Sequence, residues 1–167
     1  MTNKNETKRL GTGMIITAWL MIFILFAWYF SRELDKQQNP NQNIQRDGTA
    51  EVVLQRNHFG HYVVTGEING YEVEFMLDTG ATDVAIGSVL AQELGLKKGR
   101  PRIYHTANGQ VLGYLTRLDT VRIGNILINE VRGSINPGLK GQQVLLGMSF
   151  LKHLEFTQRG DTLILRP

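Results

Sequence analysis

Residues 10–31 read LGTGMIITAWLMIFILFAWYFS and contain no charged side chain, which restricts what this part of the chain can fold into. A helix of that length reaches ~30 Å, enough to cross the hydrocarbon core of a bilayer. Trp28 and Tyr29 lie at one end, where amphipathic aromatic side chains favour the membrane interface. The run lacks the amphipathic period of a core helix. We therefore expect a single transmembrane helix over residues 10–31, with the membrane as a partner.

The charges on either side of the apolar run predict its orientation. Three Lys or Arg and one Glu precede it, whereas the charges that follow it are balanced. The positive-inside rule then predicts a cytoplasmic N-terminus over residues 1–9. Residues 32–167 would lie on the periplasmic side of the cytoplasmic (inner) membrane. A cleaved signal peptide is the alternative, but its apolar region is usually shorter and ends in small residues.

The composition changes after the apolar run. Residues 32–50 are rich in Gln and Asn and contain almost no large apolar residue. Such a segment buries too little apolar surface to order itself, so we expect a flexible linker. The whole chain is 42% hydrophobic and 20% charged, which is typical of a globular protein. We therefore expect one folded domain over residues 51–167.

Composition and motifs exclude several classes of function. There is no cysteine, so thiol nucleophiles and cysteine-bound metals are excluded. Residues 37–167 hold 13 Lys or Arg against 12 Asp or Glu, so the domain lacks the basic charge of a nucleic-acid-binding protein. The four histidines show no metal-ligand spacing, and no phosphate-binding loop or G-x-S-x-G motif is present. We therefore expect neither a metal nor a cofactor.

The pattern of residues 51–167 is mostly that of β-strands. Apolar residues alternate with polar ones from Tyr71 to Leu77, and Asn69-Gly70 before them predicts a tight hairpin turn. One short helix is expected over residues 88–96, capped by Ser88 and ended by Gly95. A second short helix is expected near residue 150, before a C-terminal hairpin. These features predict an all-β barrel or sandwich with one or two short helices.

The strand at residues 71–77 ends directly in Asp78-Thr79-Gly80-Ala81. The strand delivers Asp78 to a partly buried place, where a lone carboxylate is costly and favours its neutral form. The glycine lets another backbone or a ligand approach closely, and the Thr79 hydroxyl can hold the turn by hydrogen bonding. A plain β-turn with Asp first and Gly late is the structural alternative.

Three elements in this order resemble the retropepsin-like aspartic proteases, the one-domain relatives of pepsin, which include bacterial membrane-anchored members. The first is the apolar strand with its Asp-Thr-Gly-Ala at residues 76–81. The second is a glycine-containing hairpin at residues 103–114, where the family has its flap. The third is Leu145-Leu146-Gly147, followed by a short helix. Together they span about residues 50–167, and the resemblance implies a small closed barrel of the retropepsin type.

The resemblance also implies roles for residues of this chain. Asp78 would be the catalytic residue, supported by the active-site loop residues Thr79, Gly80 and Ala81. Thr79 would lock two such loops together across a dimer, and Gly80 would leave room for the substrate backbone. Thr82 stands where viral members usually have an acidic residue, so the resemblance implies the catalytic Asp but not the details of the substrate subsites. The flap residues that would bind substrate are Ala107, Asn108 and Gly109.

Aspartic proteolysis needs two carboxylates that share one proton. This chain has one Asp-Thr-Gly, and the other Asp residues of the domain (47, 83, 119 and 161) lack that setting. A two-fold homodimer would supply the second Asp78. The sequence therefore predicts a membrane-anchored, homodimeric aspartic endopeptidase that acts on peptides or proteins. The alternatives are a non-catalytic module of the same fold that dimerises or binds peptides, and a structural β-domain tethered to an envelope.

Overall fold

The computed structural model describes residues 4–44, 51–106 and 109–167. The chain divides into two compact units, Met1–Gln37 and Gln38–Pro167.

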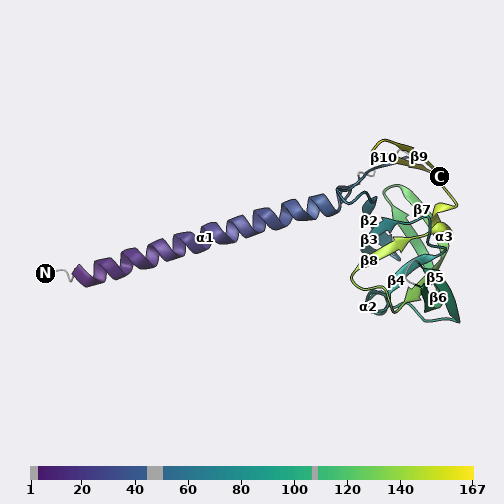
Figure 1. Cartoon of the computed structure of the whole chain (residues 1–167), viewed down its shortest axis with the longest axis horizontal. Helices are drawn as coiled ribbons and strands as arrows, with labels where there is room; N and C mark the ends of the chain where they lie inside the picture. The colour runs from purple at the N-terminus through teal and green to yellow at the C-terminus, as the bar shows by residue number, and fades with distance from the viewer. Residues whose placement is uncertain (1–3, 45–50, 107–108) are drawn as a thin grey trace. The chain divides into compact units, whose positions relative to one another are not determined.

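The first unit consists of most of helix α1, Lys4–Gln38 (Figure 1, purple). Within α1, residues Gly11–Gln38 are long and apolar enough to cross a membrane, with a mean hydropathy of 2.1 over the most apolar stretch. No part of that stretch is buried against protein. A signal sequence near an N-terminus has the same properties, so the predicted apolar helix is confirmed and both of its interpretations stay open.

The second unit is built around a closed β-barrel (Figure 1). Its strands pair around the ring in the order β2 (Val63–Ile68), β3 (Tyr71–Leu77), β8 (Gln143–Leu146), β4 (Val84–Gly87), β7 (Ile126–Asn136) and β6 (Gly109–Ile123). Pairing of Ile68 with Val121 returns β6 to β2 and closes the ring. The predicted small all-β barrel is therefore confirmed.

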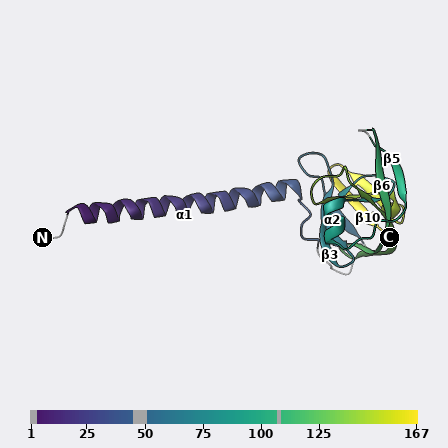
Figure 2. The same cartoon turned by 90° about the horizontal axis from the view of Figure 1, so that it is seen from below.

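Strand β5 (Pro101–Thr106) lies outside this ring and pairs with β6 alone among the described strands. Figure 2 shows β5 and β6 side by side as a long hairpin. A separate three-stranded sheet joins β1 (Val52–Gln55), β10 (Thr162–Arg166) and β9 (Glu155–Arg159). The two short helices of the unit are α2 (Ser88–Glu93) and α3 (Met148–Leu151).

The predicted hairpin between β2 and β3 is present. Asn69 and Gly70 have φ angles of 51° and 81°, the left-handed backbone that a tight two-residue turn requires. In β3, Val73 and Phe75 are buried in the barrel core as the alternation predicts, whereas Tyr71 at the start of the strand is 59% exposed. The hairpin thus directs β3 through the core toward Asp78.

Helix α2 differs from the sequence-based expectation at its first residue. We expected Ser88 to cap the helix, but the N-cap is Gly87 and no side chain among the described residues makes a capping hydrogen bond. The Ser88 hydroxyl is buried without a hydrogen-bond partner in the described structure. A serine before an apolar run looks the same at the cap as at the first helical position, so the sequence could not separate the two. The end at Gly95, with φ 66°, is as expected.

The segment that follows the apolar run also differs from expectation. Residues 32–38 belong to α1, and Asn39 and Asn41 are only 2% and 6% exposed. The Asn41 amide donates to the carbonyl oxygens of Gln55 (2.9 Å) and Val63 (2.7 Å), and its oxygen accepts the Gln55 N–H (2.7 Å). An amide that is both donor and acceptor satisfies open backbone groups of β1 and β2 and so helps to order this polar segment, in which Ile44 also packs against the core. Residues 45–50 of the expected linker lie outside the described residues.

Candidate active site

Asp78 directly follows the last residue of β3 and is half-buried. Strand β3 runs parallel to β8, with Leu77 opposite Leu146. The Asp78 N–H continues this pairing with a 3.2 Å hydrogen bond to the carbonyl oxygen of Leu146. The paired strands therefore carry Asp78 to the end of the sheet next to Gly147, which brings together two elements that are far apart in sequence.

The loop after Asp78 is a tight turn that orients its carboxylate. The Gly80 N–H donates to Asp78 Oδ1 at 2.8 Å, and the Ala81 N–H donates to the Asp78 carbonyl oxygen at 3.2 Å. Thr79 and Gly80 are exposed, and among the described residues the only neighbour that a Cβ at Gly80 would meet is Asp78 Oδ1, at 3.1 Å. The turn thus places a hydrogen-bonded carboxylate beside a glycine with open space over it.

Helix α3 supports this loop from behind. Backbone N–H groups of Met148 and Ser149 donate to the carbonyl oxygens of Ala81 (2.8 Å) and Thr82 (2.9 Å). A Cβ at Gly147 would lie 2.2 Å from the carbonyl oxygen of Asp83, so this close approach requires glycine. The predicted third element, Leu145-Leu146-Gly147, therefore packs directly against the Asp-Thr-Gly-Ala loop.

A cavity of about 430 Å³ opens beside Asp78 and Thr79. Its other lining residues are Tyr62, Leu77, Leu151, Phe156, Gln158, Leu163 and Leu165. Asp78 is the one carboxylate among these described residues, in surroundings that are otherwise mostly apolar. The cavity of a single chain therefore offers one acid, and much of its wall comes from β9 and β10.

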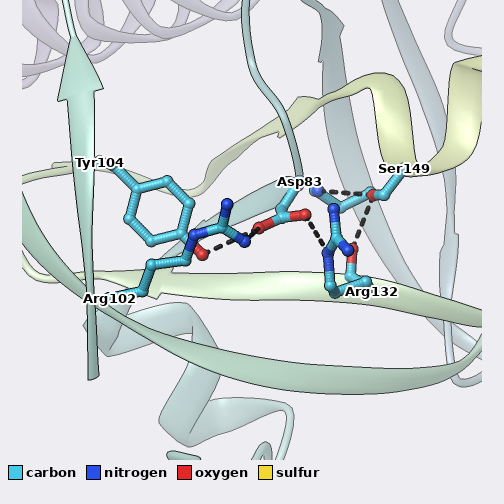
Figure 3. Close-up of polar contacts among 6 residues, drawn as sticks. Asp83, Arg102, Tyr104, Arg132 and Ser149 are labelled. Atoms are coloured by element: carbon cyan, nitrogen blue, oxygen red, sulfur yellow. Dashed lines mark hydrogen bonds and ion pairs between the residues drawn. The ribbon is translucent and has the colours of Figure 1, made fainter. Parts of the chain in front are cut away.

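Asp83, five residues after Asp78, lies in a separate polar cluster that sequence reasoning did not find (Figure 3). Its side chain is fully buried, with Oδ1 2.5 Å from the Arg132 Nε and Oδ2 accepting a 2.8 Å hydrogen bond from the Tyr104 hydroxyl. Arg102 lies 4.0 Å from Oδ2. Arg132 and Tyr104 are 49 and 21 residues away from Asp83 in sequence. The sequence near Asp83 therefore gave one sign of this cluster, an acidic residue directly before the buried strand β4.

This cluster decides the role of Asp83. A fully buried carboxylate needs a paired cation, and Arg132 supplies it. Asp83 is therefore engaged in an ion pair and is not placed to share a proton with Asp78. Asp119 lies exposed on β6, and Asp161 lies exposed in the β9–β10 turn beside Arg56. Asp47 lies outside the described residues.

The cluster also perturbs Tyr104. Burial raises the pKa of the Tyr104 phenol above its ordinary value of 10.0, and the hydrogen bond to Asp83 and that negative charge raise it further. A hydrogen bond from the Ser134 side chain and the charge of Arg102 act in the opposite direction. Tyr104 is therefore held in its neutral, hydrogen-bond-donating form.

The predicted flap corresponds to the hairpin of β5 and β6. Its strands pair up to Thr106 and Gly109, and Gly109 has a φ of 106°. Two of the predicted flap residues, Ala107 and Asn108, lie outside the described residues. Within the described ranges, no group of three or more His, Asp or Glu side chains gathers to hold a metal ion.

Known proteins are similar to the part of this chain that forms the barrel. The family model described as "gag-polyprotein putative aspartyl protease" matches residues 64–153, which include Asp78, the β5–β6 hairpin and Gly147. A crystal structure of a retropepsin-like aspartic protease from Rickettsia conorii is 36% identical in sequence, with a TM-score of 0.59. The match covers 69% of this chain and 89% of that protein.

Two further relatives are uncharacterised proteins. One, from Sinorhizobium sp, is 35% identical over 124 residues, which is 72% of this chain and 53% of the relative. The other, from Rickettsia prowazekii, is 35% identical over 120 residues, 69% of this chain and 51% of the relative. The chain thus spans about half the length of these two relatives.

Proposed function

Because the chain belongs to the retropepsin-like aspartic protease family, we propose that it is an aspartic endopeptidase in which Asp78 activates the attacking water. The observation that carries the proposal is the setting of Asp78. Its carboxylate stands at the end of β3 and is oriented by the Gly80 N–H at 2.8 Å, and Asp78 lines a cavity of about 430 Å³. These features supply an acid, its orientation and an open cavity beside it.

The chemistry requires a second carboxylate close to the first. One carboxylate, ionised, takes a proton from water, while the other, protonated, donates to the peptide carbonyl oxygen. Like charges so close cannot both ionise, so the pair shares one proton. The second acid in this proposal is Asp78 of a second copy, since Asp83 is engaged by Arg132 within the same chain.

The walls of the cavity support a homodimer. Strand β9 forms one edge of its sheet, and all five of its residues are exposed. Phe156 of β9 is 47% exposed and lines the cavity that holds Asp78 and Thr79. A two-fold axis beside this edge would set identical Asp78 loops face to face, with Thr79 in position to join them.

Roles for the remaining predicted residues follow from the same proposal. Gly80 leaves the substrate backbone room to approach Asp78, and Ala81 anchors the loop to α3 through its carbonyl oxygen. The hairpin of β5 and β6 covers the bound peptide. Substrates are peptides or proteins, and the reaction uses no cofactor.

The cellular placement is part of the proposal. Residues 10–31 anchor the protein in the cytoplasmic membrane with residues 1–9 inside, and the protease domain acts on the periplasmic side. The support for it is the long apolar stretch of α1 and the excess of Lys and Arg before that stretch. Confinement to one membrane raises the effective concentration of the chain and so favours dimers.

Cleavage of a peptide library by the full-length protein in detergent tests this function. The wild type should cleave, and Asp78→Asn, which is nearly isosteric but cannot act as a base, should lose activity by at least ~100-fold. Asp119→Asn, at an exposed position on β6, is the matched control and should cleave like the wild type. Equal cleavage by the Asp78 variant would refute the assignment, and no cleavage by any form would favour a peptide-binding or dimerisation module.

A further inference from the structure

Strand β5 is the edge strand of its sheet. It pairs with β6 and lies outside the closed ring. In β5, all of which is described, five of six residues are exposed and Tyr104 is the exception. Besides its pairing with β6, the outer strand reaches the barrel through Tyr104, which makes the direct hydrogen bond to Asp83, and through Arg102, whose guanidinium lies 4.0 Å from the same carboxylate.

The ring of Tyr104 packs between a glycine of β6 and an arginine of its own strand. Gly113 lies on the neighbouring strand β6, and a Cβ there would be 3.0 Å and 3.1 Å from the Tyr104 Cε2 and Cδ2 atoms. Any side chain at 113 would therefore press on the ring. The Arg102 guanidinium lies 5.5 Å from the centre of the same ring, within range of a cation–π interaction. Gly113 and Arg102 together hold the ring in one place.

The hydroxyl of Tyr104 reaches the buried carboxylate of Asp83, which other residues of the barrel hold in place (Figure 3). It donates to Asp83 Oδ2 at 2.8 Å, and the same carboxylate is paired with Arg132. The next residue is fixed as well, because the Val84 N–H donates to Ser149 Oγ (3.1 Å), which itself donates to the Arg132 carbonyl oxygen (2.6 Å). Asp83 is thus immobilised by β7 and α3 at the end of the loop that begins at Asp78.

We propose that Tyr104 is a positioning residue that fixes the distance between β5 and the Asp78 loop, and so controls how tightly the site holds a peptide. The proposal rests on the proposed proteolytic function, in which the peptide lies between that loop and the hairpin. Tyr104 takes no part in proton transfer. Its contribution is the same in the ground state and the transition state, so its loss raises KM and leaves kcat nearly unchanged.

Tyr104→Phe tests the hydroxyl alone, because the ring and its packing are kept. In the full-length protein, KM for a cleaved peptide should rise about tenfold while kcat stays within about twofold. Gly113→Ala, which adds a methyl group against the ring, should change KM in the same direction. Tyr71→Phe is the matched control, since this tyrosine is 59% exposed at the start of β3, and it should leave both constants unchanged.

Amide hydrogen exchange without substrate tests the same attachment independently of activity. The β5 amides that pair with β6 should exchange at least about tenfold faster in Tyr104→Phe, while the amides of β3 and β7 keep their rates. Unchanged exchange in β5 would overturn the proposal even if the protein is an active protease. Faster exchange with unchanged KM would also overturn it, because the bond would then hold β5 without acting on substrate. If the wild type does not cleave peptides, the proteolytic function fails, and the exchange rates still decide whether Tyr104 holds β5.

Discussion

The backbone N–H of Met148 donates a 2.8 Å hydrogen bond to the carbonyl oxygen of Ala81, which joins the first turn of α3 to the loop that carries Asp78. Gly147, just before it, approaches the same loop so closely that a Cβ would lie 2.2 Å from the Asp83 carbonyl oxygen and 2.6 Å from that of Ala81. The position of Asp78 therefore depends on a residue 69 positions later, through contacts between backbone atoms.

Gly147→Ala should both destabilise the domain and disable the site. The added methyl group meets backbone oxygens that cannot move without shifting the loop, so we expect a loss of about 1–3 kcal/mol in the free energy of unfolding. Peptide cleavage per folded molecule should also fall. Gly138→Ala is the control, because its nearest neighbour is the Asn136 Oδ1 atom at 3.3 Å. Urea denaturation that gives equal stability for both variants would contradict this packing.

The ordered segment before β1 leads to a second prediction. Asn41→Ala removes the partners of the Gln55 N–H and the Val63 carbonyl oxygen, so we expect a loss of about 1–3 kcal/mol in the free energy of unfolding. Asn43→Ala, at an exposed position two residues away, should change it by less than about 0.5 kcal/mol. If urea denaturation finds the two variants equally stable, the Asn41 contacts do not hold this segment in solution.

The raised pKa of Tyr104 predicts a particular dependence of stability on pH. A tyrosine in the unfolded chain loses its proton near pH 10.0, whereas the folded-state pKa of Tyr104 is higher. The folded state then binds the proton more tightly, so this contribution to stability is complete below pH 10.0 and is lost as pH rises through the folded-state pKa.

Urea denaturation at a series of pH values from about 8 to about 11 measures this effect. The free energy of unfolding of the wild type should fall more steeply above pH 10.0 than that of Tyr104→Phe, which has no phenol to titrate. Parallel curves for the two proteins would show that the hydroxyl does not keep its proton in the folded state.

Local patterns in the sequence predicted much of the fold. Asn69-Gly70 encodes its own turn, with φ angles of 51° and 81°, and the alternation in β3 correctly placed Val73 and Phe75 in the core. The strand that ends in Asp78 could be located for the same reason. In each case the signal lies within a few adjacent residues, and the structure adds little that those residues do not determine.

Features that depend on distant partners could not be predicted. Asp83 looked like any acid after a turn, because Arg132 and Tyr104 reach it only through the closed barrel. Asn41 lies in a segment whose composition predicts a flexible linker. Its burial depends on hydrogen bonds to backbone groups of β1 and β2, which lie further along the chain. Tertiary contacts, rather than local propensity, ordered both residues.

In the proposed enzyme one active site needs Asp78 from two copies of the chain, and this requirement can be measured by mixing two forms of the compact unit, residues 38–167. Wild type at a fixed concentration is equilibrated with an excess of Asp78→Asn, and peptide cleavage is measured. Random pairing with a ninefold excess should reduce activity to about one tenth, since each mixed dimer has one carboxylate where two are needed. The same excess of Asp119→Asn should cause no such loss. Activity that stays constant as the Asp78→Asn protein is added would contradict the shared site.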